Sequence, residues 1–492
     1  MPAPVETLSS VVERFGDLKL LVVGDAILDV WMSGRASRLC REAPVPVVTL
    51  DNRQEMPGGA ANAALNAASL GAQVTLLSVL GGDQAGTTLR ERLGAAGVDV
   101  SGLVVQPTRA TLLKRRVVAD GQLLVRLDEG DETPLRGRAA RRLTNHLAES
   151  FPAHDAVLVS DYAAGTIGSS LIAALARLQA TAPRVLVIDA KNLAAYRGAG
   201  ATAVKPNYQE TIRLLGLHQA TSTSHRVDQL KRDGQRILSL LDAHMAAVTL
   251  DSEGALLFEQ GAPPYRTYAH PVPASKATGA GDTFAAVLTL ALAAGCDLPA
   301  AGELASAAAT IAVDQTATAT ASCSRPALQL AVAGDHRRRV TDLEQLRSMV
   351  ARYRQERRHI VFTNGCFDLL HRGHVAYLNQ AKTLGDVLIV AVNADASVRR
   401  LKGPGRPLNT LEDRMAVLAA LSCIDHLVAF EDDSPAELLR IIRPDLLVKG
   451  GDYRRDSVPE GPLVEALGGR VEILPYLPNQ STTAMIQRIR TG

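Results

Sequence analysis

The chain reads TNGCFDLLHRGH over residues 363–374, and this stretch decides the fold of its second half. The apolar residues 360–362 directly before it have the pattern of a short buried strand. Residues 375–384 after it carry apolar side chains at helical spacing. We therefore predict that His371 and His374 lie at the start of a helix that follows a strand.

A helix start is a favourable place for an anion. Its unpaired N–H groups and its positive dipole end attract negative charge, and imidazole donors at i and i+3 lie on one face. A lone histidine pair would more often be an ordinary surface feature. The combination of strand, glycine-containing turn, H-x-G-H spacing and amphipathic helix instead predicts a triphosphate site.

The arrangement resembles the H-x-G-H nucleotidyltransferase superfamily, whose members attack the α-phosphorus of a nucleoside triphosphate and release pyrophosphate. Later segments agree in order and approximate spacing with its sugar-phosphate adenylyltransferases; they are Asp395, RLKG at 400–403, RP at 406–407, DRM at 413–415, VKGGDY at 448–453 and STT at 481–483. The resemblance implies that His371 and His374 stabilise the triphosphate during catalysis. The ATP-binding residues that it implies in this half are Asn364, Gly365, Cys366, Phe367, Asp395, Lys402, Arg406, Lys449, Ser481 and Thr482.

Composition sets limits on the whole chain. Its 492 residues predict more than one domain, and a formal charge of +2 with mixed signs argues against a nucleic-acid-binding surface. Five scattered cysteines without C-x-x-C spacing suggest neither a disulfide framework nor a zinc site, which fits a reducing compartment. Because no signal-peptide pattern and no membrane-spanning apolar run is found, we expect a cytoplasmic protein without membrane association.

Strand-like and helix-like segments alternate along the chain, which predicts α/β layers with parallel sheets. The predicted strands are 20–23, 156–159, 185–188, 246–250, 387–392, 426–430 and 446–448. Residues 111–118 and 122–127 flank the dipeptide Asp120-Gly121 and predict a β-hairpin that belongs to a small lid. The composition predicts a first domain at 1–325, a linker at 326–341 and a second domain at 342–492 that opens with a helix.

Two helix starts are predicted in the second domain from capping patterns. Ser434 and Glu437 have the spacing of a capping box, and Asn409 and Glu412 have a similar spacing.

The first domain carries TGAGDT at residues 278–283, before an apolar helical run at 284–294. Small residues allow the backbone to approach a phosphate, and Asp282 stands where a carboxylate could accept a hydroxyl proton. Taken alone, the segment could be a tight turn with an N-capping aspartate. It is accompanied by PGGAAN at 57–62, by Asp25 and Asp29 after the first strand, and by NYQE at 207–210.

Together these segments resemble the ribokinase-like carbohydrate kinases over about residues 16–316. The resemblance implies that Asp282 is the catalytic base and that ATP phosphates bind at Gly279, Ala280 and Gly281. It further implies ATP contacts at Asn207, Tyr208, Gln209 and Glu210, with Asn207 and Glu210 positioning Mg²⁺ indirectly. The sugar would be held by Asp29, Gly58, Gly59 and Asn62.

Three cations lie on the predicted lid hairpin: Lys114, Arg116 and Arg126. Lys114 and Arg116 share strand parity and therefore one face. A neutral sugar needs no such charge, so the three residues would suit a substrate that already carries a phosphate. A charged solvent face, with Asp128 as a partner, explains them equally well.

A ribokinase-like domain with a small β lid, joined to a Rossmann-like H-x-G-H nucleotidyltransferase domain, resembles the bifunctional heptose 7-phosphate kinase and heptose 1-phosphate adenylyltransferase family. That resemblance implies phosphorylation of D-glycero-β-D-manno-heptose 7-phosphate at O1, then adenylyl transfer to heptose 1-phosphate, with ATP as substrate of both halves and Mg²⁺ as cofactor. Because the 7-phosphate must be lost between the two steps, a separate phosphatase is implied. Lid hairpins in ribokinase-like proteins often pair between subunits, so a homodimer is expected.

Two alternatives remain open from the sequence. The same chemistry could act on another sugar or alcohol phosphate with CTP or GTP, since H-x-G-H spacing does not specify the base. Alternatively, one half could be a degenerate nucleotide-binding regulator of the other.

Overall fold

The computed structural model describes residues 8–120, 122–220, 223–251, 254–267, 279–315, 323–332, 339–340, 343–451 and 457–474. The chain folds into two compact units, Met1–Gln329 and Leu330–Gly492. The predicted site residues Ser481 and Thr482 lie outside the described residues. Among the helices of the described ranges, none is both long and apolar enough to cross a membrane.

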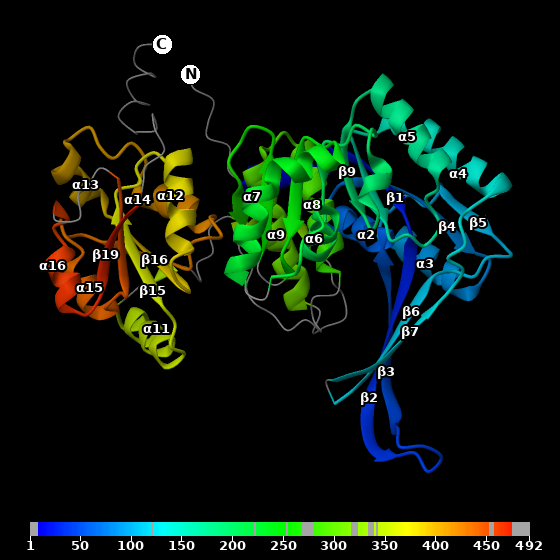
Figure 1. The fold of residues 1–492 in the computed structure, drawn as a ribbon, viewed down its shortest axis with the longest axis horizontal. Helices are drawn as coiled ribbons and strands as arrows, with labels where there is room; N and C mark the ends of the chain where they lie inside the picture. The colour runs from blue at the N-terminus through cyan, green and yellow to red at the C-terminus, as the bar shows by residue number, and fades with distance from the viewer. Residues whose placement is uncertain are drawn as a thin grey trace. The chain divides into compact units, whose positions relative to one another are not determined.

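The first unit is built on a nine-stranded sheet with the order β13-β12-β11-β10-β9-β8-β1-β4-β5 (Figure 1). Its strands are β1 (Lys19–Gly24), β4 (Gln73–Gly81), β5 (Leu103–Gln106), β8 (Ala156–Asp161), β9 (Val185–Ala190), β10 (Ala203–Val204), β11 (Met245–Thr249), β12 (Ala255–Glu259) and β13 (Tyr265–Thr267). The strands from β5 to β11 pair in parallel, and β12 and β13 extend the sheet antiparallel. The four apolar runs predicted as strands in this half lie within or overlap these strands.

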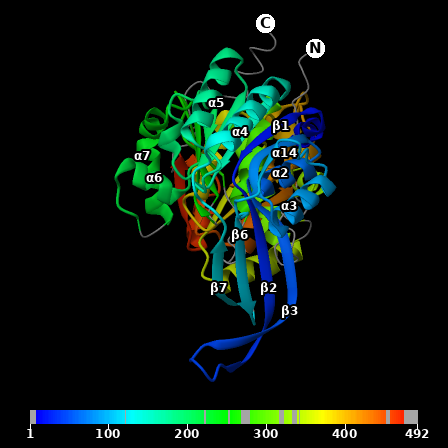
Figure 2. The same cartoon turned by 90° about the vertical axis from the view of Figure 1, so that its right-hand side faces the viewer.

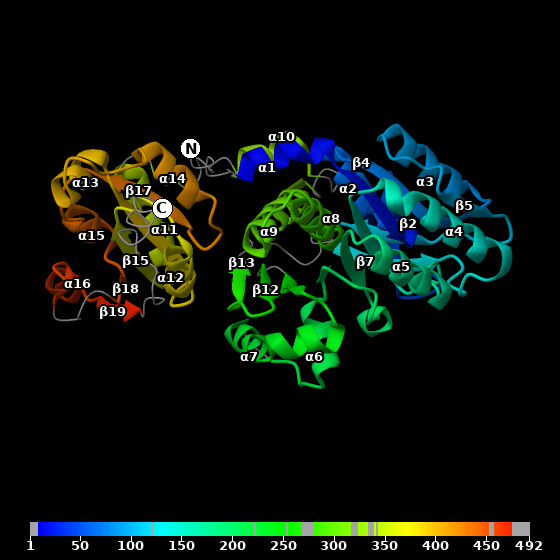
Figure 3. The same cartoon turned by 90° about the horizontal axis from the view of Figure 1, so that it is seen from above.

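Helices cover both faces of this sheet. One face packs against α2 (Ala60–Ser69), α8 (Ala280–Ala293) and α9 (Leu298–Gln315), and the other against α4 (Gly137–Ser150), α5 (Ser169–Thr181), α6 (Tyr208–Leu215) and α7 (Thr223–Leu241). Figure 3 shows α8 and α9 side by side. Because α2 presents mainly alanine at its buried positions, α2 and α8 pack closely. The remaining helices are α1 (Leu8–Arg14), α3 (Gln84–Ala95) and α10 (Arg325–Val332).

A separate four-stranded sheet forms the lid, with the order β3-β2-β6-β7. Its strands are β2 (Ala26–Leu39), β3 (Pro46–Gly59), β6 (Leu113–Ala119) and β7 (Gln122–Glu129). The predicted hairpin is confirmed as the antiparallel pair β6–β7. The long β2–β3 hairpin, which supplies the other half of the lid, was not predicted. Figure 2 shows the four strands running away from the helical layers.

The second unit contains a parallel sheet of six strands in the order β14-β17-β16-β15-β18-β19. They are β14 (Arg339–Val340), β15 (Ile360–Gly365), β16 (Val387–Asn393), β17 (His426–Phe430), β18 (Leu446–Gly450) and β19 (Arg470–Leu474). One face packs against α11 (Leu343–Gln355), α15 (Ala436–Ile442) and α16 (Gly461–Ala466), and the other against α12 (Arg372–Lys382) and α14 (Leu411–Ala419); α13 (Asp395–Lys402) follows β16. Every residue of β16 is buried, as expected for a strand covered on both faces.

Each parallel sheet contains one point at which the strand order reverses. In the first unit it lies between β1 and β8, and in the second between β15 and β18. The carboxyl ends of the strands at such a point leave a crevice that commonly binds ligands. Asp29 follows β1, His371 and His374 follow β15, and Lys449 lies in β18.

The two predicted caps are wrong in detail. Helix α14 is capped by Thr410, whose hydroxyl accepts a hydrogen bond from the backbone of Asp413 at 3.2 Å. Asn409 instead donates from its amide to the carbonyl of Asp368, inside the H-x-G-H segment. Helix α15 begins after Pro435 and has no side-chain cap.

Candidate active sites

Asp282 is the centre of the candidate kinase site. It stands in the first turn of α8 and is 5% exposed. Its Oδ1 accepts a hydrogen bond from the Tyr162 hydroxyl at 2.6 Å, and its Oδ2 accepts one from the Asn62 amide at 3.0 Å. Burial raises the pKa of Asp282 to about 6, although these two hydrogen bonds oppose the increase. The geometry therefore provides an oriented carboxylate that is ionised at neutral pH and near its pKa.

A chain of amides fixes the orientation of Asn62. Asn66, one turn later on α2, donates to the Asn62 side-chain oxygen at 3.0 Å and accepts from the Cys323 backbone at 3.1 Å. Both asparagines are buried. Asn66 is thus a buried link that supports Asn62.

Asp25 holds the loop that carries Tyr162. This fully buried carboxylate accepts backbone hydrogen bonds from Tyr162, Ala164 and Thr166 at 2.8, 3.1 and 3.1 Å. Because Asp25 follows β1 and Tyr162 follows β8, the contact joins the two strands at the reversal point. Burial and the charge of Asp282 raise the pKa of Tyr162 well above its ordinary value, so the hydroxyl remains a donor.

The start of α8 forms the predicted phosphate loop. Gly279 is its N-cap, with φ of 88°, a left-handed conformation that glycine adopts without strain. A Cβ on Gly281 would lie 3.7 Å from the Lys205 ammonium, so Lys205 faces this loop. Lys205 is buried and pairs with Asp189 at 3.0 Å. Burial acts against its charge, but the carboxylates of Asp189, Glu210 and Asp282 raise the pKa of Lys205.

Asn207 and Glu210 form a capping box at the start of α6. The Asn207 side chain accepts from the Glu210 backbone at 2.8 Å, and Glu210 Oε2 accepts from the Asn207 backbone at 2.9 Å. The other oxygen of Glu210 pairs with Lys191 at 3.0 Å. The ring of Tyr208 is packed in the core and its hydroxyl bonds to Gln229, whereas Gln209 is exposed.

The chemistry of this region fits a magnesium ion carried by ATP. Within the described ranges, no group of three or more His, Cys, Asp or Glu side chains could hold a metal ion. Magnesium is usually held by one or two carboxylates together with substrate phosphates and water. Asp189 and Glu210, whose charges both act on Lys205 beside the phosphate loop, provide such carboxylates.

The lid contributes Asp29 to the same end of the sheet. Arg116 donates to the Asp29 carboxylate and lies over the Trp31 ring, 4.9 Å from its centroid. A Cβ on Gly58 would lie 2.2 Å from Asp29 Oδ2, so a larger residue there would displace that carboxylate from its present position. Gly59, with φ of 58°, caps α2.

The other two lid cations also have partners. Arg126 stands opposite Arg116 in the β6–β7 pair and forms an exposed ion pair with Asp128. The Lys114 ammonium lies 5.2 Å from the centroid of the Tyr162 ring, so the lid contacts the residue that donates to Asp282. Among the described residues, Arg116 and Arg126 form ion pairs with Asp29 and Asp128, whereas Lys114 forms no ion pair.

In the second unit, both histidines lie at the start of α12 as predicted. His371 is its N-cap and accepts a hydrogen bond from the Gly373 backbone at 3.1 Å. The two rings are 4.0 Å apart between centroids, and Phe367 meets His374 edge-on at 5.5 Å. Burial and the neighbouring His371 lower the pKa of His374 to about 4, and burial also lowers the pKa of His371. The pair is therefore neutral near pH 7.

A cluster around the buried ion pair of Lys449 and Glu460 lies at the reversal point of the sheet. Lys449, on β18, donates to the Asn364 side chain at 2.8 Å and pairs with Glu460 at 3.1 Å. Burial lowers the pKa of Lys449, and Glu460 acts against that decrease. Tyr377 of α12 donates to the Val448 carbonyl at 2.9 Å, which packs the helix over the end of β18.

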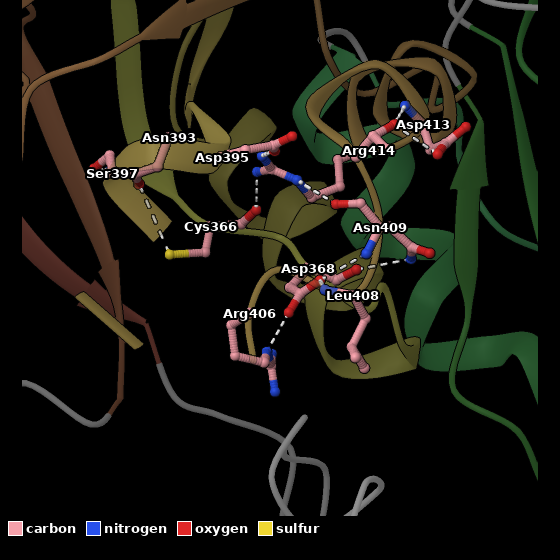
Figure 4. A network of polar contacts seen from close by, with 11 residues as sticks. Cys366, Asp368, Asn393, Asp395, Ser397, Arg406, Leu408, Asn409, Asp413 and Arg414 are labelled. Carbon is pink, nitrogen blue, oxygen red and sulfur yellow. Dashed lines mark hydrogen bonds and ion pairs between the residues drawn. The ribbon is translucent and has the colours of Figure 1, made fainter. Parts of the chain in front are cut away.

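Arg406 and Arg414 hold the loops around the H-x-G-H segment in place through hydrogen bonds and ion pairs (Figure 4). Arg406 pairs with the buried Asp368, which also accepts the Leu408 and Asn409 backbone N–H groups at 2.6 and 3.1 Å. The predicted cation Arg406 therefore already has a carboxylate partner. Asp368 closes the loop 406–409 onto the H-x-G-H segment.

Arg414 is the second of these arginines and is 2% exposed. It donates to Asp395 at 2.7 Å, to the Cys366 carbonyl at 2.5 Å and to the Asn409 carbonyl at 3.2 Å. Lys402 ends α13 and is exposed. Gly365 lies close to the Phe367 ring, which a Cβ would approach to 3.2 Å.

Several site residues were not predicted in these roles. They are Tyr162, Asn66, Asp189, Lys205, Asp368, Arg414 and Glu460. Asp368 and Arg414 stand in segments already quoted, and Tyr162 follows a predicted strand end. Lys205 and Glu460 had no distinguishing local pattern.

Comparison with known proteins supports the division of chemistry between the units. Residues 17–325 match the model of the pfkB family carbohydrate kinases, and residues 362–483 match the cytidylyltransferase-like model. Phosphofructokinase-2 from Escherichia coli, solved with potassium, is 20% identical with a TM-score of 0.53, covering 63% of this chain and 97% of that one. Arabidopsis thaliana ribokinase, complexed with ribose and ATP, is 22% identical with a TM-score of 0.50 and the same coverage. The chain is thus an enzyme that joins a pfkB-family carbohydrate kinase to a nucleotidyltransferase domain.

Relatives that match along the whole chain narrow this class. Bifunctional protein HldE of Pseudomonas aeruginosa PAO1 is 42% identical, over 97% of this chain and 98% of that protein. The protein of the same name from Geobacter sulfurreducens is 38% identical over 98% of each chain. The chain belongs to the family of bifunctional HldE proteins, which confirms the expected pairing of a ribokinase-like domain with a nucleotidyltransferase domain.

Proposed function

We propose that the chain phosphorylates D-glycero-β-D-manno-heptose 7-phosphate at O1 and transfers AMP from ATP to heptose 1-phosphate. The observation that carries the proposal is the Asp282 carboxylate, buried at the start of α8 and held by Tyr162 and Asn62. Such a group is what deprotonation of a sugar hydroxyl requires. The lid cations Lys114, Arg116 and Arg126, of which Lys114 lies over Tyr162, suit a sugar that already bears a phosphate.

In the kinase step, the O1 hydroxyl gives its proton to Asp282 as its oxygen bonds to the γ-phosphorus of ATP. The bond from that phosphorus to the oxygen of the β-phosphate breaks, and ADP leaves. The N–H groups of Ala280 and Gly281 and the Lys205 ammonium would hold the charge on the transferring group. Magnesium bound with ATP would neutralise further phosphate charge, with Asp189 and Glu210 on the protein side.

The sugar would lie under the lid. Asp29, Gly58, Gly59 and Asn62 line its proposed position, while Lys114, Arg116 and Arg126 meet its phosphate end. Because Arg126 and Asp128 are exposed, a substrate phosphate could replace Asp128 as the partner of Arg126.

In the transferase step, an oxygen of the sugar 1-phosphate attacks the α-phosphorus of ATP, and the bond to the pyrophosphate breaks. The attacking group is already an anion, so no base is needed. Neutral His371 and His374 each offer one N–H donor to the triphosphate, and the start of α12 adds backbone donors. The nucleotide contacts proposed for Asn364 to Phe367, Asp395, Lys402 and Arg406 surround this position.

Product analysis tests the proposal. The purified chain, incubated with ATP, Mg²⁺ and heptose 7-phosphate, should yield the 1,7-bisphosphate by mass spectrometry but no ADP-heptose, because a separate phosphatase must first remove the 7-phosphate. With heptose 1-phosphate and ATP it should release pyrophosphate. ADP-heptose formed from heptose 7-phosphate by this chain alone would contradict the sequence of steps.

The cytidylyltransferase-like match makes CTP the specific alternative for the second half. Pyrophosphate release should therefore be compared with ATP, CTP and GTP at equal concentration. Faster release with CTP would replace adenylyl transfer by cytidylyl transfer and leave the kinase proposal intact. A kinase half without activity on any heptose phosphate would favour a regulatory role for it.

A homodimer through the lid is the second element of the proposal. Strand β7 ends the lid sheet, and Leu123, Val125 and Leu127 on it are 51, 43 and 46% exposed. Exposed apolar side chains on an edge strand commonly mark an interface. Light scattering should give a dimer for the wild type and a monomer for Val125→Lys, whereas the exposed Val105→Lys on β5 should remain dimeric.

A further inference from the structure

In the buried ion pair of Lys449 and Glu460, one carboxylate oxygen of Glu460 lacks a hydrogen-bond donor among the described residues. Glu460 is 8% exposed, and its Oε1 accepts from Lys449 at 3.1 Å. Among the described residues, Oε2 of the same carboxylate is buried and accepts no hydrogen bond. A buried carboxylate oxygen without a donor is costly, so a donor is expected there in the working enzyme.

The location of this oxygen points to a ligand. Lys449, the penultimate residue of β18, contacts Asn364, the penultimate residue of β15, at the point where the strand order of the sheet reverses. Asn364 belongs to the same segment as His371 and His374. The pair therefore lies in the crevice where ligands of such sheets bind.

The charges select the ligand group. A phosphate only accepts hydrogen bonds and is anionic, so Glu460 would repel it and could not bond to it. A cation would be repelled by Lys449. A hydroxyl is neutral and can donate a hydrogen bond, so it matches a carboxylate oxygen that lies beside an ammonium group.

We propose that Glu460, held in place by Lys449, forms a hydroxyl-binding subsite of the transferase half, in which a sugar hydroxyl donates to Glu460 Oε2. This rests on the proposed nucleotidyl transfer and gives Lys449, expected as an ATP-binding residue, the role of holding Glu460. The acceptor sugar and the ribose of the nucleotide both carry hydroxyls of this kind.

Glu460→Gln is the principal test, because it keeps the side-chain length and removes the charge. The KM for the hydroxyl-bearing ligand should rise about 10- to 100-fold with kcat nearly unchanged, since hydrogen bonds to charged groups have that strength. Glu465→Gln, an exposed residue of α16, is the matched control and should behave as wild type. The kinase activity of the same chain serves as an internal control for folding.

The two ligand sources give different results. A higher KM for sugar 1-phosphate alone assigns the subsite to the acceptor. A higher KM for ATP, together with a smaller preference for ATP over 2′-deoxy-ATP or 3′-deoxy-ATP, assigns it to the ribose. Unchanged KM values for both substrates overturn the proposal, and would leave the pair as a structural ion pair.

Binding measurements test the hydroxyl-binding subsite independently of the proposed nucleotidyl transfer. Calorimetric titration of ATP and of sugar 1-phosphate into wild type and Glu460→Gln reports the subsite even if no pyrophosphate is released. If Glu460→Gln lowers the thermal stability of the second unit, Lys449→Gln/Glu460→Gln removes both charges. The double variant should show the same loss of affinity, and an affinity equal to wild type would overturn the proposal.

Discussion

The two candidate sites use burial in opposite ways. Each lies where a parallel sheet reverses its strand order, and each has a helix start for phosphates. In the kinase half, burial raises the pKa of an acid, Asp282, to about 6, while in the transferase half it lowers the pKa of His374 to about 4. The difference follows from the nucleophiles proposed: a sugar hydroxyl must lose a proton, whereas a phosphate oxygen is already ionised.

The largest effect is expected from Asp282→Asn, which removes the base and keeps the shape of the side chain. Phosphorylation of heptose 7-phosphate should fall about 10²- to 10⁴-fold. Pyrophosphate release from ATP and heptose 1-phosphate should be unchanged, because that step needs no base. If coupled-enzyme assays showed an equal loss of phosphorylation and of pyrophosphate release, the two reactions would not take place at separate sites.

Arg414→Met should have the largest effect on stability. Its buried guanidinium donates to Asp395 and to two backbone carbonyls, and its loss removes all three of these hydrogen bonds. We expect the second unit to lose about 3 kcal/mol, measured as faster hydrogen exchange in β15 and β16. Arg400→Met, which breaks an exposed pair with Asp433, is the matched control and should cost less than about 1 kcal/mol.

The first unit supplies an independent readout in the same experiment. Trp31 is the single tryptophan of the chain and lies on β2 of the lid. Its fluorescence on unfolding should therefore be identical in wild type and Arg414→Met. A changed fluorescence transition would mean that the arginine stabilises more than its own unit.

His374→Ala tests the transferase half in the same way as Asp282→Asn tests the kinase half. Loss of one preorganised donor to a developing charge commonly costs about 10²- to 10³-fold in kcat. Pyrophosphate release should fall by this amount while heptose 7-phosphate phosphorylation remains at the wild-type rate. A variant that retains full transferase activity would remove His374 from the proposed mechanism.

The sequence was sufficient to predict the α/β layers and the segments that form the phosphate-binding helix starts of the two candidate sites. Strands buried on both faces leave continuous apolar runs, and residues such as Asp282, His371 and His374 stand at helix starts that local spacing reveals. The β6–β7 hairpin was found because Asp120-Gly121 marks its turn. The β2–β3 hairpin was missed because most residues of its strands are exposed or only half-buried and lack a strong apolar alternation.

Partners that come from distant segments could not be predicted. Tyr162 and Asp282 are separated by 120 residues, and Lys449 and Glu460 meet only when β18 and the start of α16 are packed together. Asn409 was expected to cap α14, but it bonds to Asp368 and leaves the cap to Thr410. Sequence spacing identifies residues with suitable chemistry, whereas their pairing depends on tertiary contacts.

The smallest predicted effect concerns the tuning of the base by Tyr162. The Tyr162 hydroxyl bonds to Oδ1 of Asp282 and lowers its pKa, so Tyr162→Phe should raise that pKa further above 6. Asp282 must be ionised to act, so the acid limb of kinase kcat/KM should move about one pH unit or more upward, with little loss near pH 9. Tyr196→Phe removes a similar buried hydroxyl, bonded to Asp161 at 2.6 Å, and should leave the profile in place. If Tyr162→Phe lowers the rate equally at every pH, Tyr162 contributes to packing alone and does not adjust the pKa of Asp282. The contrast between Asp282, whose pKa suits proton transfer, and the neutral His371 and His374 would then be weaker.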